Sequence, residues 1–306
     1  MNRDEKIVML KLDIIFKRIF GNENNKDIIA VFISDLLEIP RESIKAIYID
    51  NVELTPEYFQ QKFSRLDLKL KVDERIVNIE MQVNKDFDFN ERTLYYWSKI
   101  YSDQLKAGEE YGQLKQTICI NITNFNQFDC KDYHSHFKVM ESTRHEVLSN
   151  KFAIHFFELK KIKYAKKNKR MEDWLNLINA ETEGDLMDIQ NTSKIPEVQK
   201  TIVMLRELSA DEKVRQEAFY REKRIHDEAI ALGGALREGI EIGKAEGRAE
   251  GRAEGKAEGR AEGRAEGRAE GKAEGIIEAI NRMAEKMRKA GFSEEQIKEV
   301  IDVKQD

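Results

Sequence analysis

RLDLKLKVDERIVNIEMQV, residues 65–83, is the part of the chain whose pattern says most about its architecture. Apolar and polar residues alternate along 66–72 and again along 77–83, so each half has one face to bury and one to expose. With a turn at Asp73 and Glu74, the halves pair as an antiparallel hairpin in which the numbers of opposed residues sum to 147. Asp67 then lies opposite Glu80 on the polar face, with Cβ atoms about 4.5–5.5 Å apart.

Two carboxylates at that separation repel each other, and a divalent cation with oxygen ligands would offset the repulsion. The turn leaves alternatives open, because Asp-Glu is not a pair that tight hairpin turns prefer. An odd-length loop would break the direct opposition, although a bulge could still leave both acids near one site. The other interpretation is a solvated outer face on which Asp67 and Glu80 have no joint role.

Asp67 followed by Glu80-Met81-Gln82 resembles the D…(D/E)-x-K motif of PD-(D/E)XK nucleases, in the branch of recombination-promoting nucleases and transposases, where Gln often replaces Lys. Three more stretches resemble that family: LDIIFKRIFG at 12–21, ERTLYYWSKIYSDQLKAGEEYGQLKQTICINI at 91–122 and FAIHFFELKK at 152–161. The resemblance covers most of the chain. It implies an α/β fold with a restriction-endonuclease-like αβββαβ core and a helical C-terminal extension.

The hydrophobic periodicity is compatible with that order of elements. It predicts helices at 7–20, 26–37 and 90–107, and strands at 43–54, 116–123 and 152–159, beside the hairpin. Pattern alone indicates only a mixed α/β protein with helices packed on a short sheet. We expect four parts: a nuclease-like core at 1–165, a helical extension at 166–243, a repeat spacer at 244–275 and a C-terminal helical hairpin at 276–306.

The spacer consists of tetrapeptides of the form (Lys/Arg)-Ala-Glu-Gly. A step of four residues turns each residue type by about 40° per repeat, so no fixed apolar stripe forms on a helix. Each glycine costs about 1 kcal/mol relative to alanine, which predicts a marginal helix or a flexible spacer. Small-residue packing between two such helices is the alternative. Ser209 with Glu212 predicts the capping box of a long charged helix before it, and Ser293 an N-cap after it.

The resemblance also assigns roles in the site. It implies that Asp67 and Glu80 ligate Mg²⁺, for which Mn²⁺ would substitute, and that the backbone carbonyl of Met81 adds an oxygen. Gln82 would orient water or a phosphate oxygen by hydrogen bonds, but it lacks the charge of the usual lysine.

Arg92 at the start of the following helix, or Lys69 on the acidic face, would supply the missing charge. Asp13 could hold a metal-bound water, or be a plain exposed helix acid. Tyr96, Gln104 and Tyr111 are expected to pack the helical middle segment.

Other polar residues give weaker signals. The run 151–170 holds eight Lys or Arg and one acid, Glu158, and its Lys163, Lys166 and Lys167 are candidate DNA contacts or ordinary solvated surface. His134 and His136 are expected in an exposed polar loop rather than a zinc site, and His155 in a structural role.

Composition suits an intracellular enzyme. The chain has 306 residues, a net charge of −5 and two cysteines, which we expect to be reduced thiols. No apolar run is long enough to predict a membrane span and no signal peptide opens the chain, so a cytoplasmic location is expected. No motif indicates an organic cofactor. We therefore predict a metal-dependent DNA endonuclease that promotes recombination or DNA mobility. The alternative is a catalytically weak nuclease-fold module that binds DNA or protein and forms homo-oligomers through its C-terminal helices.

Overall fold

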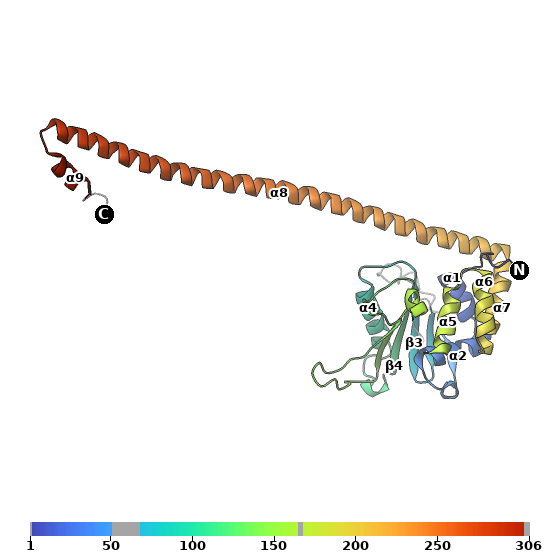
Figure 1. Ribbon diagram of the computed structural model, residues 1–306. Helices are drawn as coiled ribbons and strands as arrows, with labels where there is room; N and C mark the ends of the chain where they lie inside the picture. The colour runs from blue at the N-terminus through green and yellow to red at the C-terminus, as the bar shows by residue number, and fades with distance from the viewer. Residues whose placement is uncertain (1, 51–67, 165–167, 303–306) are drawn as a thin grey trace. The chain divides into compact units, whose positions relative to one another are not determined.

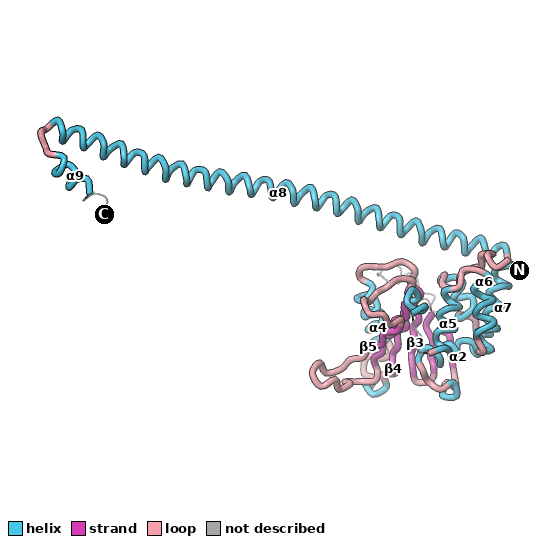
Figure 2. Tube along the Cα trace, in the orientation of Figure 1, coloured by secondary structure: helices cyan, strands magenta, loops and turns pink. Residues whose placement is uncertain are grey.

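The computed structural model describes residues 2–50, 68–164 and 168–302 (Figures 1 and 2). The chain divides into two compact units, unit 1 (Met1–Ile230) and unit 2 (Ala231–Asp306). Within the described residues, unit 1 holds a six-stranded sheet in the order β1-β2-β3-β4-β6-β5. Its strands are β1 (Ile47–Ile49), β2 (Leu68–Val72), β3 (Arg75–Gln82), β4 (Gln116–Thr123), β5 (His134–Phe137) and β6 (Phe152–Glu158).

The hairpin predicted from the alternating pattern is confirmed as β2–β3. Leu68 pairs with Ile79 and Leu70 with Val77, which is the predicted register. The turn adopts a positive φ of 51° at Asp73. The carboxylate of Asp73 accepts the backbone N–H of Ala46 at 2.9 Å and so ties the turn to the segment before β1.

Strand direction changes across the sheet. β2 is antiparallel to both of its neighbours, β1 and β3. β3, β4 and β6 run parallel to one another, and β5 is antiparallel to β6. The carboxyl ends of three parallel strands therefore meet at one edge, and their amino ends meet at the opposite edge.

Helices cover both faces of the sheet (Figure 1). On one face, the main core is closed by α1 (Asp13–Phe20), α2 (Lys26–Leu37), α5 (Lys169–Asn179), α6 (Glu183–Thr192), α7 (Pro196–Ala210) and the start of α8 (Glu212–Lys289). Helix α4 (Phe89–Ser102) lies on the other face over a smaller core that includes Phe89 and Phe156. Short 3-10 helices connect these elements: η1 (Glu23–Asn25), η2 (Arg41–Ser43), η3 (Tyr111–Gln113) and η4 (Leu159–Tyr164).

Several predicted boundaries were wrong. The first helix begins only at Asp13, because the preceding segment pairs elsewhere: Lys6 bridges to Thr182. Of the strand predicted at 43–54, the described part forms only β1, and α4 ends at Ser102 rather than at 107. Strand β5 was not predicted at all, since four residues are too few to establish a period.

The predicted capping box at Ser209 is absent. The Ser209 hydroxyl lies inside α7, donates to the Leu205 carbonyl and accepts the Val8 amide, so it is not available as a cap. The side chain of Asp211 accepts the amide of Val214 instead and caps α8.

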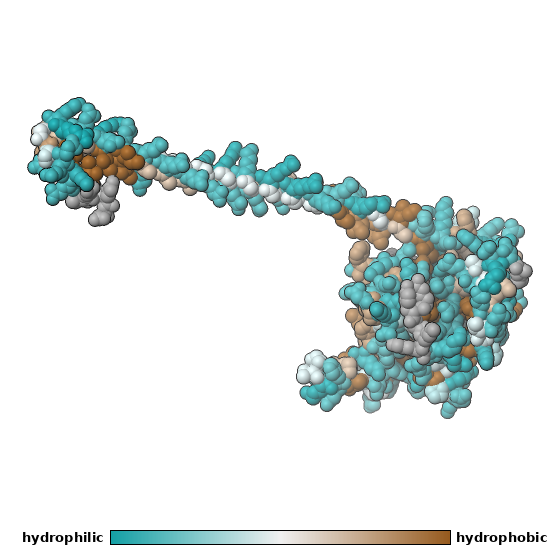
Figure 3. All heavy atoms as spheres, in the orientation of Figure 1, coloured by the Kyte–Doolittle hydropathy of each residue, from teal (hydrophilic) through white to brown (hydrophobic). Residues whose placement is uncertain are grey.

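Unit 2 contains the rest of α8 and α9 (Glu294–Asp302). The structure shows the repeat 244–275 as continuous, exposed helix, and no ion pair forms among these residues, all of which are described. Its surface is hydrophilic with pale small residues between the charges (Figure 3). Helix α8 ends at Lys289 and α9 follows after a short turn, in which Gly291 has a φ of 91°. The Ser293 side chain accepts the amide of Gln296 at the start of α9.

Candidate functional site

Strand β3 presents the candidate residues by alternation. Ile79 and Met81 are buried in the main core, so only the backbone of Met81 is available to a ligand. Asn78, Glu80 and Gln82 point to the opposite face, which α4 covers.

Glu80 is partly buried beside a polar side chain that lacks a full set of hydrogen bonds. The amide nitrogen of Asn78 donates to Glu80 Oε1 at 3.1 Å. The amide oxygen of Asn78 is buried without a hydrogen-bond partner in the described residues. Burial raises the pKa of the neighbouring Cys119 thiol, and the negative charge of Glu80 raises it further. A carboxylate beside an orphaned amide oxygen is a donor set that fits a hard divalent cation.

Glu80 alone does not make a metal centre. In the part of the chain that the structure describes, no three His, Cys, Asp or Glu side chains are grouped so that they could hold a metal ion. Asp67, the predicted partner of Glu80, lies outside the described residues, as do Lys166, Lys167 and the side chain of Lys163. The carboxylate pair therefore stays a prediction, made in a register that is confirmed as far as Leu68.

Gln82 is held by two hydrogen bonds next to a guanidinium. Its amide nitrogen donates to the Asn84 carbonyl at 2.9 Å, and its amide oxygen accepts Arg92 Nη2 at 2.9 Å. Arg92 Nη1 binds Asp86 at 2.9 Å, and the guanidinium lies 5.0 Å from the centroid of the Phe89 ring. The structure thus brings together Gln82 and Arg92, one of the two residues expected to replace the missing lysine charge.

Asp13 and Lys69 are both engaged in ion pairs. The carboxylate of Asp13 accepts two hydrogen bonds from Arg221 of α8, at 2.6 and 2.8 Å. Lys69 on β2 lies opposite Asn78 on β3, and the Lys69 ammonium is 3.3 Å from a carboxylate oxygen of Asp50. Neither of the two partners, Arg221 and Asp50, was singled out from the sequence.

The start of α8 also reaches the connection after β3. Asn84 donates its side-chain N–H to the carbonyl of Ile225 at 2.8 Å, within unit 1. Because the backbone carbonyl of Asn84 also accepts from Gln82, the site residues of β3 are linked to α8 through one residue.

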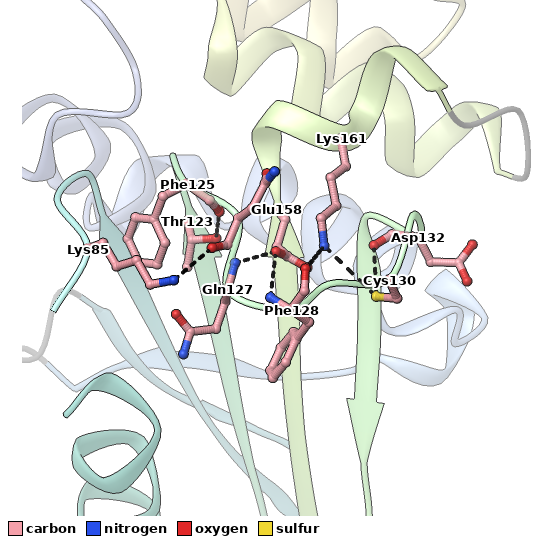
Figure 4. Close-up of polar contacts among 10 residues, drawn as sticks. Lys85, Thr123, Phe125, Gln127, Phe128, Cys130, Asp132, Glu158 and Lys161 are labelled. Carbon is pink, nitrogen blue, oxygen red and sulfur yellow. Dashed lines mark hydrogen bonds and ion pairs between the residues drawn. The ribbon is translucent and has the colours of Figure 1, made fainter. Parts of the chain in front are cut away.

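A buried ion pair lies on the same face of the sheet as Gln82, two strands away (Figure 4). Gln82 pairs with Thr123 and Thr123 with Glu158, so the three share a face at the carboxyl edge. Glu158 is fully buried and lies 2.6 Å from the ammonium of Lys161. Its other oxygen accepts the backbone N–H of Gln127 and, at 3.2 Å, that of Phe128, as Figure 4 shows. This carboxylate therefore anchors the loop after β4 and is not exposed among the lysines and arginines of the run 151–170.

His155 lies buried in a strand, as expected, but His134 and His136 do not lie where the sequence indicated. His134 and His136 belong to β5, not to a polar loop, and their rings stack on His155 of β6. His134 Nε2 is 2.9 Å from His155 Nδ1. Burial lowers the pKa of His155 to about 3 and that of His134 to about 4, so both rings are neutral at pH 7.

Tyr96, Gln104 and Tyr111, the three residues expected to pack the middle segment, differ in their surroundings. Tyr96 is buried on α4, as predicted. Gln104 lies beyond the end of α4 and donates to Thr117 Oγ1 at 2.9 Å, which ties this segment to β4. Tyr111 is exposed, and the expectation that it packs the helix was wrong.

Fold and site together define a mixed α/β protein with acidic and amide side chains on one face of its central hairpin. A family model described as PD-(D/E)XK nuclease family transposase matches residues 10–235. This range is more than half of the chain, so the chain belongs to the PD-(D/E)XK nuclease family transposases. No curated protein and no solved structure gives a significant match.

Family membership agrees with the architecture. The predicted mixed α/β core and helical C-terminal extension are confirmed, and the extension includes one long helix, α8. The family indicates nuclease- or transposase-like function. Among the described residues, no helix combines the length and the apolar character that crossing a bilayer requires.

Proposed function

We propose that this protein is a metal-dependent DNA endonuclease that promotes recombination or DNA mobility. The observation that carries the proposal is the face of β3 on which Glu80 and Gln82 lie next to each other, with Arg92 bonded to Gln82. These residues occupy the E-x-Q part of the motif in a chain that belongs to a PD-(D/E)XK nuclease family.

Asp67, Glu80 and the Met81 carbonyl would hold Mg²⁺, with Mn²⁺ as a substitute. The bound ion would neutralise charge on the scissile phosphate and lower the pKa of a water. Asn78 keeps the Glu80 carboxylate in place by the hydrogen bond to Oε1.

Arg92 would supply the positive charge that a lysine provides elsewhere in the motif. Gln82 and Asp86 use two of its five N–H donors, so further donors remain for a phosphate oxygen. Gln82 itself is then a positioning residue, because both ends of its amide are occupied by Asn84 and Arg92.

The test is nicking of supercoiled plasmid by purified protein in Mg²⁺. Glu80→Gln should lower the rate at least about a hundredfold, since even the outer partners of a metal are commonly worth 10–100-fold. Glu91→Gln makes the same change at an exposed position in the first turn of α4 and should cut at the wild-type rate. Nicking by Glu80→Gln at the wild-type rate would refute the assignment.

The same assay separates the alternative function. Wild-type protein that retains DNA in a binding assay but does not nick it in Mg²⁺ or Mn²⁺ would be a binding module of nuclease fold. The long α8 and the closing helix α9 would then be the elements for self-association. A cytoplasmic location is part of the proposal, and the free state of Cys119 and Cys130 supports it.

A further inference from the structure

An open depression of about 840 Å³ lies at the amino ends of the parallel strands, within unit 1. The β2–β3 turn, the segment before β1 and the starts of β4 and β6 line it. Four of its lining residues are cations, namely Lys45, Arg75, Lys115 and Lys151. This edge is opposite to the one at which Gln82 ends β3.

The depression carries an excess of positive charge in a chain whose net charge is negative. Its acids are Asp73, whose carboxylate is turned to the backbone amides of residues 45 and 46, and Glu74, which pairs with Lys115 at 3.1 Å. Lys45, Arg75 and Lys151 form no ion pair with any residue that the structure describes. Unpaired cations that share a depression attract an anionic ligand.

Strand pairing sets the spacing of these cations. Arg75 pairs with Gln116, and the carbonyl of Lys151 accepts the amide of Thr117 at 2.9 Å. Arg75 starts β3 and Lys151 immediately precedes β6, the two strands that flank β4, so two interstrand spacings, about 10 Å, separate their backbones. A row of separated cations suits several phosphates of one chain better than a single compact anion.

An exposed aromatic ring completes the surface. Tyr48 lines the depression with 62% of its surface exposed, and Lys26 Nζ lies 5.7 Å from the centroid of its ring. An aromatic ring beside a basic groove is the arrangement on which unpaired bases stack, and a base inside a duplex has no free face to offer.

We propose that this depression binds single-stranded nucleic acid, with phosphates on Lys45, Arg75 and Lys151 and a base on Tyr48. This site is separate from the candidate hydrolytic site, because the seven steps of β3 from Arg75 to Gln82 put about 23 Å between them. It therefore goes beyond the proposed nuclease activity and does not depend on it.

The test measures binding of a fluorescein-labelled oligothymidylate of about twelve nucleotides by anisotropy, with EDTA present to prevent hydrolysis. The variant carries Lys45→Gln, Arg75→Gln and Lys151→Gln. Each phosphate contact on a single strand contributes about 0.7 to the dependence of log affinity on log salt, so this variant should lower the slope by about two. Binding of wild-type affinity and slope would overturn the proposal.

A matched control removes the same charge elsewhere in unit 1. Lys194→Gln, Lys213→Gln and Lys223→Gln replace three exposed lysines of the helical side and should leave the slope unchanged. An equal decrease of the salt slope in this control would show that only the net charge of the protein affects binding, and it would overturn the assignment of the site.

Tyr48→Leu tests the base contact. It should weaken binding of the oligothymidylate by roughly fivefold to a hundredfold and leave binding of an abasic strand of equal length unchanged. Equal effects on both strands would overturn the stacking contact. Glu80→Gln should bind the oligonucleotide as wild type does, so failure of the nicking assay and failure of this site are distinguishable.

Discussion

Acidification should destabilise unit 1 through its stacked histidines. Burial lowers the pKa of His155 to about 3 and that of His134 to about 4, and the charges of Lys138 and His136 push the pKa of His155 in the same direction. Glu38 acts oppositely and raises the pKa of His134. In the unfolded chain both rings take a proton near pH 6.5, whereas in the folded protein they resist it. The stabilisation is therefore complete above pH 6.5 and is lost as the pH falls towards 4.

The magnitude follows from proton linkage. His155 is 5% exposed. Below about pH 6.5 the unfolded state gains a proton that the folded ring does not. Over the remaining ~1.5 units down to pH 5, at about 1.4 kcal/mol per unit, this costs about 2 kcal/mol. His134 is only partly buried, so solvent screening makes its contribution smaller.

Urea unfolding followed by circular dichroism at pH 7, 6 and 5 measures the effect. His155→Gln removes the titrating ring and should lose about 2 kcal/mol less than wild type over this range. His226→Gln, at an exposed position of α8, is the matched control and should follow wild type. A wild-type pH dependence in His155→Gln, or an NMR titration of the His155 ring with a midpoint near 6.5, would refute the reasoning.

Three further predictions concern the carboxyl edge and the repeat. Glu158→Gln should cost about 3–5 kcal/mol in urea unfolding, because it leaves Lys161 buried without its partner, and adding Lys161→Met should recover most of the loss. Gln82→Lys should slow plasmid nicking, because its ammonium would repel the adjacent guanidinium, and adding Arg92→Gln should restore a single charge and the rate. An isolated peptide of 244–275 should show little helix by circular dichroism, because glycine is costly and no ion pairs compensate. A strongly helical, concentration-dependent signal from that peptide would indicate self-association instead.

The parts of the fold that the sequence predicted are those with a local cause. The period-two pattern with a two-residue turn predicted the observed β2–β3 register, and α2 and β4 begin and end at the predicted residues. The same pattern placed Glu80 and Gln82 on one face, and Arg92, which bonds to Gln82, was one of two candidates for the charge that Gln82 lacks.

The parts that it missed depend on partners distant in the chain. Arg221 reaches Asp13 across 208 positions, and no local pattern indicates such a pairing. Glu158 looked like the lone acid of a basic run, but its role follows from burial under a loop some thirty residues earlier. Ser209 met the rule for a cap and failed because tertiary contacts occupied its hydroxyl.

The tight β2–β3 turn has a consequence for the order of folding. Its first pair, Val72 with Arg75, closes a minimal loop, whereas β3 and β4 pair residues about forty positions apart and must first lose more chain entropy. We expect the hairpin to form early and to serve as the template on which the parallel strands assemble. The strand that bears Glu80 would then have its register set before the rest of the sheet exists, so an insertion in this turn would misdirect assembly at its first step.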